Sequence, residues 1–179
     1  MAELKQIRVS GFGGQGVILA GVILGHAAIF DGKWVAGSSS YGAQARGGYA
    51  RSDVIISDQP IVFPHVVDTD ILITMAQTAY ERYSAELAPD ALILFDNRLV
   101  SPARSVDVKQ VGVAATTHAI KKLHQKQAAN IVMLGAAVAM TGVVSREGLR
   151  SAIRGNVEER FVDVNLKAAE LGFFLGEQR

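Results

Sequence analysis

The sequence has 179 residues, of which 49% are hydrophobic and only 7% aromatic, so its length suits one domain with an aliphatic core. Chains of this kind are typical of parallel sheets that helices cover on both faces. The 18 basic and 17 acidic residues nearly cancel, which argues against a nucleic-acid-binding protein, because such proteins neutralise phosphates with excess Lys and Arg. Since the sequence has no cysteine, it can form neither disulfides nor thiolate sites for zinc or iron–sulfur clusters.

The start of the chain and its most apolar stretch indicate a cytoplasmic protein. Residues 1–6 are polar and lead directly into a strand, unlike a signal peptide. The longest apolar stretch, residues 131–144, is shorter than the roughly 20 residues that a membrane-spanning helix needs. We therefore expect a buried helix there and no membrane partner.

The chain begins with a strand and an apolar helix. A short buried strand is predicted over residues 7–10, and residues 17–30 form a helix that is apolar nearly all round. Gly21 and Gly25 lie on one face of this helix, although each costs about 1 kcal/mol of helix stability relative to alanine. They predict that the helix packs closely against a sheet or another helix.

A β-hairpin is predicted in the next part of the chain. A strand over residues 33–39 precedes a glycine-rich loop, and residues 49–56 alternate as a second strand. The turn signal at residues 57–60 leads into residues 61–63. We therefore expect residues 49–56 and 61–63 to pair as an antiparallel hairpin.

The remainder alternates between strand and helix and then becomes helical. Strands over 70–75 and 91–95 flank a helix over 78–87, which predicts a right-handed βαβ unit, and residues 106–111 predict a further strand. Four helices are predicted in the C-terminal third: 117–126, 128–141, 146–153 with Ser145 as N-cap, and a last helix capped by Asn156 with Glu159 three residues on. The expected fold is α/β, with a Rossmann-like, mostly parallel sheet, a β-hairpin and a helical C-terminal third, in a single domain over residues 1–179.

A glycine-rich turn joins the first strand to the first helix, where Gly11, Gly13 and Gly16 match G-x-G-x-x-G. Glycines at this position let a phosphate approach the N–H groups of a helix N-terminus. The second strand, however, ends in residues 38–41 (SSSY) without the Asp or Glu that holds a ribose, and no Walker A lysine follows. Two alternatives stay open, a cofactor- or anion-binding turn and a tight packing connection. The residues concerned are Gly11, Gly13, Gly14, Gln15 and Gly16.

The loop after the second predicted strand is basic, since no acidic residue occurs between Asp31 and Asp53. Arg46 precedes two glycines, so its guanidinium is expected beside flexible, exposed backbone. We expect it to bind a phosphate, a carboxylate or an acidic patch of another subunit. The alternative is a solvated loop with ordinary surface arginines. The candidate interface or active-site-access residues are Tyr41, Gly42, Gln44, Arg46, Gly47, Gly48 and Arg51.

Three segments together resemble the gamma subunit of 2-oxoacid:ferredoxin oxidoreductases, the family of the 2-oxoglutarate, 2-oxoisovalerate and pyruvate enzymes. They are residues 11–17 (GFGGQGV), 40–48 (SYGAQARGG) and 57–61 (SDQPI), in matching order and spacing. The resemblance extends from about residue 5 to the C-terminal helix and is closest to the 2-oxoglutarate enzymes. Gln44 departs from the family pattern, in which we expect Glu, and so removes a carboxylate that could pair with an arginine of the loop.

The resemblance implies a multi-subunit enzyme that decarboxylates a 2-oxoacid on thiamine diphosphate, passes electrons through iron–sulfur clusters to ferredoxin and transfers the acyl group to coenzyme A. It implies alpha and beta partner subunits, with a ferredoxin-like delta subunit as a further candidate. Thiamine diphosphate, its Mg and the clusters belong to these partners. For this chain it implies no catalytic residue and no cofactor bound by the chain alone. The expected role is structural, as an accessory subunit that shapes access to the active site.

Two other functions stay open, a stand-alone Rossmann-like nucleotide-binding protein and a purely structural assembly module. Neither a metal site nor a serine nucleophile is predicted, because the four histidines form no H-E-x-x-H and residues 38–40 lie in no G-x-S-x-G. The sequence leaves open which 2-oxoacid is used, whether this chain contacts coenzyme A, and the stoichiometry.

Overall fold

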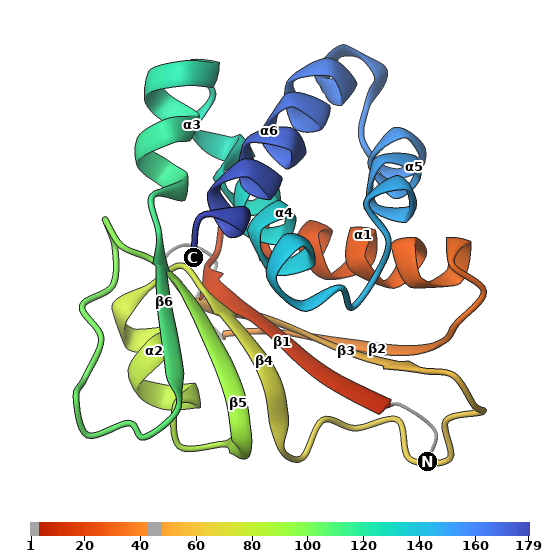
Figure 1. Ribbon diagram of the computed structural model, residues 1–179, viewed down its shortest axis with the longest axis vertical. Helices are drawn as coiled ribbons and strands as arrows, with labels where there is room; N and C mark the ends of the chain where they lie inside the picture. The colour runs from red at the N-terminus through yellow and green to blue at the C-terminus, as the bar shows by residue number, and fades with distance from the viewer. Residues whose placement is uncertain (1–3, 43–47) are drawn as a thin grey trace.

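The computed structural model describes residues 4–42 and 48–179, which form a mixed α/β fold (Figure 1). Its strands are β1 (Leu4–Phe12), β2 (Trp34–Tyr41), β3 (Tyr49–Ser57), β4 (Thr69–Thr74), β5 (Leu87–Asp96) and β6 (Lys109–Val113). Its helices are α1 (Val17–Phe30), α2 (Gln77–Tyr83), α3 (Ala115–Leu123), α4 (Ala129–Thr141), α5 (Arg146–Asn156) and α6 (Glu159–Glu177), with a 3₁₀ turn at Lys126–Ala128.

The strands form one six-stranded sheet in the spatial order β2-β3-β1-β4-β5-β6. β1, β4, β5 and β6 are parallel neighbours, whereas β3 pairs antiparallel with both β1 and β2. β3 is therefore the strand of this sheet that runs against the others. The predicted mostly parallel α/β fold with a helical C-terminal third is confirmed.

The β-hairpin, however, uses an earlier segment than the sequence predicted. β2 and β3 form it, with Trp34 opposite Ser57 and Tyr41 opposite Ala50. Residues 61–63 form no strand and lie in an irregular segment between β3 and β4. The predicted pairing of residues 49–56 with 61–63 is wrong because β2 and β1 occupy both edges of β3.

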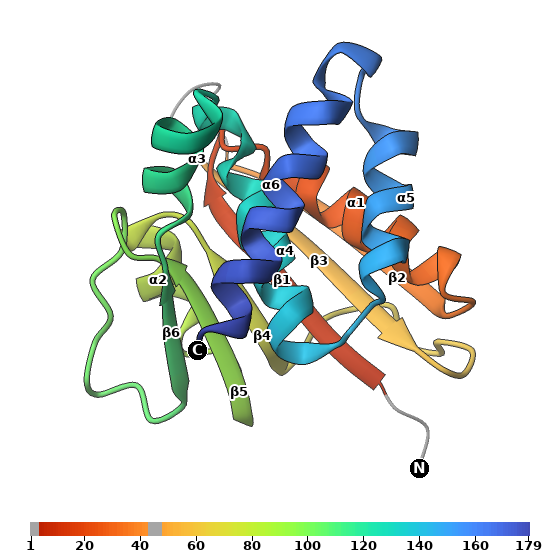
Figure 2. The same ribbon diagram turned by 45° about the horizontal axis from the view of Figure 1, so that its top comes forward.

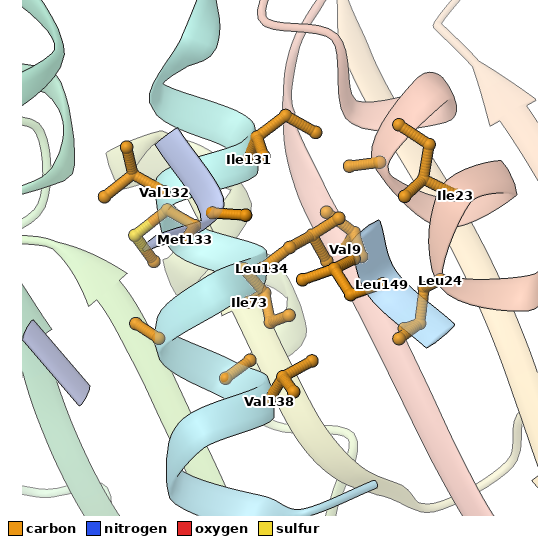
Figure 3. Close-up of a cluster of buried hydrophobic side chains, with 14 of the residues drawn as sticks. Val9, Ile23, Leu24, Ile73, Ile131, Val132, Met133, Leu134, Val138 and Leu149 are labelled. Carbon is orange, nitrogen blue, oxygen red and sulfur yellow. The ribbon is translucent and has the colours of Figure 1, made fainter. Parts of the chain in front are cut away.

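Helices cover the two faces of the sheet unequally (Figures 1 and 2). The larger core lies between the sheet and α1 and α4, and α5 and α6 form an outer layer against those two helices. Figure 3 shows this core, in which Val9 and Ile73 of the sheet lie near Leu134 of α4. On the opposite face, Leu72 and Ile93 pack against α2.

Missing side chains bring helices close to their neighbours. A Cβ at Gly21 would lie 2.0 Å from the Ser52 hydroxyl oxygen of β3, which confirms the predicted close approach of α1 to the sheet. A Cβ at Gly172 of α6 would lie 2.3 Å from the Val132 carbonyl oxygen of α4, and one at Gly135 only 2.5 Å from the Ala169 carbonyl oxygen. The backbones of α4 and α6 therefore touch through paired glycines.

The helix ends show one correct and one wrong prediction. Ser145 caps α5, because its hydroxyl oxygen accepts a hydrogen bond of 2.8 Å from the Gly148 N–H. Asn156 does not cap α6, because it is the last residue of α5 and donates its side-chain N–H to the Ala152 carbonyl (2.8 Å). Glu158 takes the N-cap position of α6 without a side-chain cap bond. Two predicted elements have different bounds in the structure. The strand predicted at 106–111 is β6 (Lys109–Val113), and the helix predicted at 78–87 is the shorter α2 (Gln77–Tyr83).

Among the residues that the structure describes, no helix combines the length and the apolar character needed to cross a membrane.

Candidate functional site at the carboxyl edge of the sheet

The glycine-rich turn lies where the chain leaves the sheet in two directions. β1 and β4 are parallel neighbours, and Ser10 stands opposite Thr74 near their carboxyl ends. After β1 the chain enters α1 on one face, and after β4 it enters α2 on the other (Figure 2). Open α/β sheets bind ligands at such a switch point, outside the carboxyl ends of the strands. The predicted turn therefore lies at the place where a site is expected.

The side chain of Gln15 hydrogen-bonds to the ends of β1 and β4. Its side-chain oxygen accepts a hydrogen bond of 2.7 Å from the Phe12 N–H, and its side-chain nitrogen donates one of 2.8 Å to the Met75 carbonyl. One carboxamide thus joins the end of β1 to the residue that follows β4. Gln15 is consequently a positioning residue in this structure.

The outer glycines of the turn serve close packing. A Cβ at Gly11 would lie 2.4 Å from the Gln15 side-chain oxygen, and one at Gly16 would lie 2.3 Å from the Asn130 side-chain nitrogen. That nitrogen donates a hydrogen bond of 3.0 Å to the Gly16 carbonyl, while the Asn130 oxygen accepts one of 2.8 Å from the Ile131 N–H. Gly16 also has a φ of 70°, in the left-handed region that favours glycine.

The tip of the turn, by contrast, is open. A Cβ at Gly14 would have no neighbour within 4 Å, and one at Gly13 would approach only the Gly48 carbonyl oxygen, at 3.8 Å. The two sequence alternatives therefore apply to different residues of one motif. Gly11 and Gly16 form the tight connection, and Gly13 and Gly14 leave room for a ligand.

Two cavities meet at Gly14. The larger, of about 450 Å³, combines apolar walls from Leu19, Val157 and Phe161 with carboxamides. The smaller, of about 290 Å³, is lined by Lys126 and others beside the turn. The carboxamides of the larger cavity are Gln125, Gln127, Asn130, Asn156 and Asn165. The larger cavity is also lined by Glu158, whereas Lys126 and the N-terminus of α1 favour negative charge on the side of the smaller cavity.

The turn and the base of the predicted basic loop are joined directly. The Gly13 N–H donates a hydrogen bond of 3.0 Å to the Gly48 carbonyl, and the Gly42 N–H donates one of 2.7 Å to the Tyr49 carbonyl. Tyr41 ends β2, and Arg51 lies in β3. The structure thus brings these predicted loop residues beside the glycine turn. The predicted residues Gln44, Arg46 and Gly47 lie outside the described residues.

A buried ion pair on the α2 face of the sheet was missed by the sequence analysis. Arg8 of β1 is 2% exposed and stands opposite Asp53 of β3. Its guanidinium donates two hydrogen bonds to the Asp53 carboxylate, of 2.8 and 3.2 Å, and another to Glu86. The signal available in the sequence was a charge of opposite sign inside each of two apolar strands.

The pKa of Arg8 follows from these contacts. Burial alone would lower it, because desolvation disfavours the charged guanidinium. The hydrogen bonds and charges of Asp53 and Glu86 outweigh burial, so that the pKa of Arg8 is raised above its ordinary value. Arg8 is therefore a permanent buried cation whose charge the two carboxylates stabilise.

Further arginines surround the same region. The Arg51 Nε lies 3.3 Å from the second carboxylate oxygen of Asp53. The Arg82 guanidinium, at the end of α2, lies over the Tyr49 ring at 4.9 Å and over the Tyr83 ring at 5.6 Å. These side chains line a cavity of about 260 Å³, which we call the arginine–tyrosine pocket. It is formed by Ser40, Tyr41, Gly42, Tyr49, Arg51, Arg82 and Tyr83.

The site offers groups that can bind and position a ligand. Within residues 4–42 and 48–179, no cluster of three or more His, Cys, Asp or Glu side chains could hold a metal ion. The cavity walls supply carboxamides, hydroxyl groups, the cations Lys126, Arg51 and Arg82, and the carboxylate of Glu158. Such groups recognise a ligand or a partner chain.

Comparison with known proteins agrees with this organisation. The chain is 42% identical to the 2-oxoglutarate synthase subunit KorC of Methanocaldococcus jannaschii over 97% of its length and 95% of that protein. Its identity to the KorC subunit of Archaeoglobus fulgidus is 34%, over 99% and 91% of the two chains. It superposes on the gamma subunit of a keto/oxoacid ferredoxin oxidoreductase from Geobacter sulfurreducens with a TM-score of 0.87 and 41% identity, covering 98% and 99% of the chains.

One further structure shares the fold within a longer polypeptide. The chain matches 32% of a 2-oxoglutarate:ferredoxin oxidoreductase chain from Magnetococcus marinus, with a TM-score of 0.88 and 23% identity. The family model described as pyruvate ferredoxin/flavodoxin oxidoreductase matches residues 6–175. The chain therefore belongs to the pyruvate ferredoxin/flavodoxin oxidoreductase family.

Proposed function

We propose that this chain is the gamma subunit of a multi-subunit 2-oxoacid:ferredoxin oxidoreductase that acts on 2-oxoglutarate. The observation that carries the proposal is similarity over nearly the whole chain to subunits named for 2-oxoglutarate, at 34–42% identity. Relatives named for ketoisovalerate share 31–33% identity, and those named for pyruvate, alone or together with ketoisovalerate, 27–29%. This order favours 2-oxoglutarate over the other two acids. It also favours an accessory subunit over a stand-alone nucleotide-binding protein.

In this proposal the redox and decarboxylation chemistry belongs to other chains. The residues present do not fit an iron–sulfur cluster, because none of the 179 is a cysteine. We assign thiamine diphosphate, Mg and the clusters to alpha and beta subunits, or to a ferredoxin-like delta subunit. Ferredoxin is the acceptor, coenzyme A the co-substrate, and the cytoplasm the location.

The glycine turn and the loop after β2 form the part of this subunit that we place at an interface or at the mouth of the active site. Tyr41, Gly42, Gly48 and Arg51 gather beside the open glycines Gly13 and Gly14 at the carboxyl edge of the sheet. Arg46 follows Gly42 in the sequence and lies outside the described residues. A cationic, glycine-rich edge of this kind suits an anionic group of a substrate or a carboxylate of a partner chain.

The opposite edge of the sheet carries apolar side chains that suit subunit packing. Leu4 and Trp34 both pair with Ser57 and are 45% and 54% exposed. The segment that follows Ser57 exposes Val62 by 96% and Phe63 by 61%. Such groups of exposed apolar side chains mark protein–protein contacts. We assign this edge, at the start of β1 in Figure 1, to assembly with the larger subunits.

Affinity purification of the tagged chain under anaerobic conditions tests the proposal. We expect it to recover partner chains that contain thiamine diphosphate and iron–sulfur clusters. Recovery of the chain alone would contradict a subunit role.

Charge reversal at Arg46 (R46E) then separates the two roles of the loop. Loss of activity with the complex intact favours proximity to the active site, and loss of assembly favours an interface. R104E is a matched control, because Arg104 is an exposed arginine outside the helices and strands.

A further inference from the structure

The arginine–tyrosine pocket carries more positive than negative charge. Three guanidiniums lie over the ring of Tyr83, those of Arg8 at 4.8 Å, Arg82 at 5.6 Å and Arg51 at 5.8 Å. Two carboxylates form ion pairs with these guanidiniums. Asp53 pairs with both Arg8 and Arg51, and Glu86 pairs with Arg8. One positive charge in this group is therefore unmatched.

Arg82 is the cation without a carboxylate. It forms no ion pair or hydrogen bond with the residues that the structure describes, and the rings of Tyr49 and Tyr83 hold its guanidinium instead. Residues 43–47 cannot supply a carboxylate in any conformation, since their sequence is AQARG. Stacking on aromatic rings leaves the N–H groups at the edge of a guanidinium available to an acceptor.

The rest of the lining adds hydrogen-bond donors. Ser40, Tyr41 and Tyr49 bring hydroxyl groups, and Arg51 brings a second guanidinium that is one-third exposed (32%). The volume of about 260 Å³ lies below the usual range for a whole drug-sized ligand, so the pocket suits one group of a larger molecule. The complementary group is an anion with several acceptor oxygens.

From this geometry we propose that the arginine–tyrosine pocket binds a phosphoryl group of a small phosphorylated molecule. A phosphoryl group offers three terminal oxygens, which match two guanidiniums and several hydroxyls better than the two oxygens of a carboxylate. Arg82 makes the principal charge contact, and Tyr49 and Tyr83 fix its plane. Tyr83 places this pocket on the α2 face of the sheet, and its lining shares no residue with the two cavities that meet at Gly14. The proposal stands whether or not the chain acts on 2-oxoglutarate.

Titration of the full chain with inorganic pyrophosphate tests this inference, by calorimetry and by amide chemical shifts. We expect saturable binding, with shifts at residues 40–42, 49–51 and 82–83. R82Q should weaken binding by about tenfold or more, because it removes the charge-assisted hydrogen bonds. Arg82 is exposed and at the end of a helix, so the substitution leaves the fold intact, which circular dichroism checks.

Two controls make the result decisive. R104Q removes an exposed arginine elsewhere and should leave pyrophosphate binding unchanged. Glutarate, a dicarboxylate, tests whether the pocket prefers carboxylate oxygens to phosphoryl oxygens. It should bind more weakly than pyrophosphate. The absence of pyrophosphate binding, equal binding by R82Q and the parent chain, or a preference for glutarate would each overturn the proposal.

Discussion

At the scale of single residues, one glycine motif combines two roles that its sequence could not separate. The strand-turn-helix placement of Gly11, Gly13 and Gly16 is visible in the sequence, but the partners that divide their roles are remote. Gln15 reaches Met75, 60 residues away, and Asn130 reaches Gly16 across 114 residues. These contacts exist only after the sheet and α4 have packed. The motif could therefore be found from the sequence. The sequence could not show that Gly11 and Gly16 pack closely while Gly13 and Gly14 remain open.

Replacing Gln15 with alanine tests its positioning role. Q15A leaves the Phe12 N–H and the Met75 carbonyl without their partner, and the loss of two such half-buried hydrogen bonds costs roughly 1–3 kcal/mol in total. We expect the free energy of unfolding in urea to fall by this amount. Q127A is the control, since Gln127 is exposed. An equal effect of the two substitutions would refute the role of Gln15.

The buried pair of Arg8 and Asp53 is the second residue-scale feature. D53A removes the main partner of a guanidinium that is 2% exposed, and breaking a buried pair in this way costs about 3–5 kcal/mol. We expect a loss of unfolding free energy in that range by urea denaturation. E86Q should cost far less, because the Glu86 side chain is 48% exposed and the Asp53 bonds remain. A D53A protein as stable as the parent would show that the pair does not stabilise the fold.

At the scale of elements, periodicity located most strands and helices, and the errors came from competition between neighbours. α1 was predicted with its observed bounds because its apolar residues end sharply at Phe30. Residues 61–63 failed as a strand because β3 already had two partners, which depends on strand order and not on local pattern. The predicted N-cap at Asn156 is wrong because the side chain of Asn156 donates a hydrogen bond to the Ala152 carbonyl within α5. The close contact of α4 with α6 was likewise invisible, since Gly135 and Gly172 meet only in three dimensions.

A pair of glycine substitutions tests that contact. G172A places a methyl group 2.3 Å from the Val132 carbonyl oxygen, so α6 must shift, and overpacking of this kind costs about 1–3 kcal/mol. G155A is the matched control in α5, where a Cβ would have no neighbour within 4 Å, and it should stabilise by about 0.5–1 kcal/mol through helix propensity. Thermal unfolding of both variants measures the difference. Stabilisation by G172A would contradict close helix contact.

At the scale of the whole molecule, composition already indicated an aliphatic α/β protein, and the sheet confirms it. The distribution of surface groups was not available from composition. The glycine turn and Arg51 lie at one edge of the sheet, and the exposed side chains of Leu4 and Trp34 lie at the other. This separation suits a subunit that packs through one edge and presents anion-binding groups at the other.

The apolar edge makes a prediction about assembly. F63D places a charge on a side chain that is 61% exposed, so the isolated chain should keep its stability while co-purification of the larger subunits weakens. F174D is the control, because Phe174 is a second exposed phenylalanine, 51% exposed on α6. Equal recovery of partners by F63D and the parent chain would remove this edge from the interface.

The most direct measurement is anaerobic, 2-oxoglutarate-dependent reduction of ferredoxin by the assembled complex, by the complex prepared without this chain, and by the chain alone. We predict turnover only for the assembled complex, since the sequence has no cysteine to hold an iron–sulfur cluster. Turnover by the purified chain alone, or full activity of the complex in its absence, would contradict its role as a required accessory subunit.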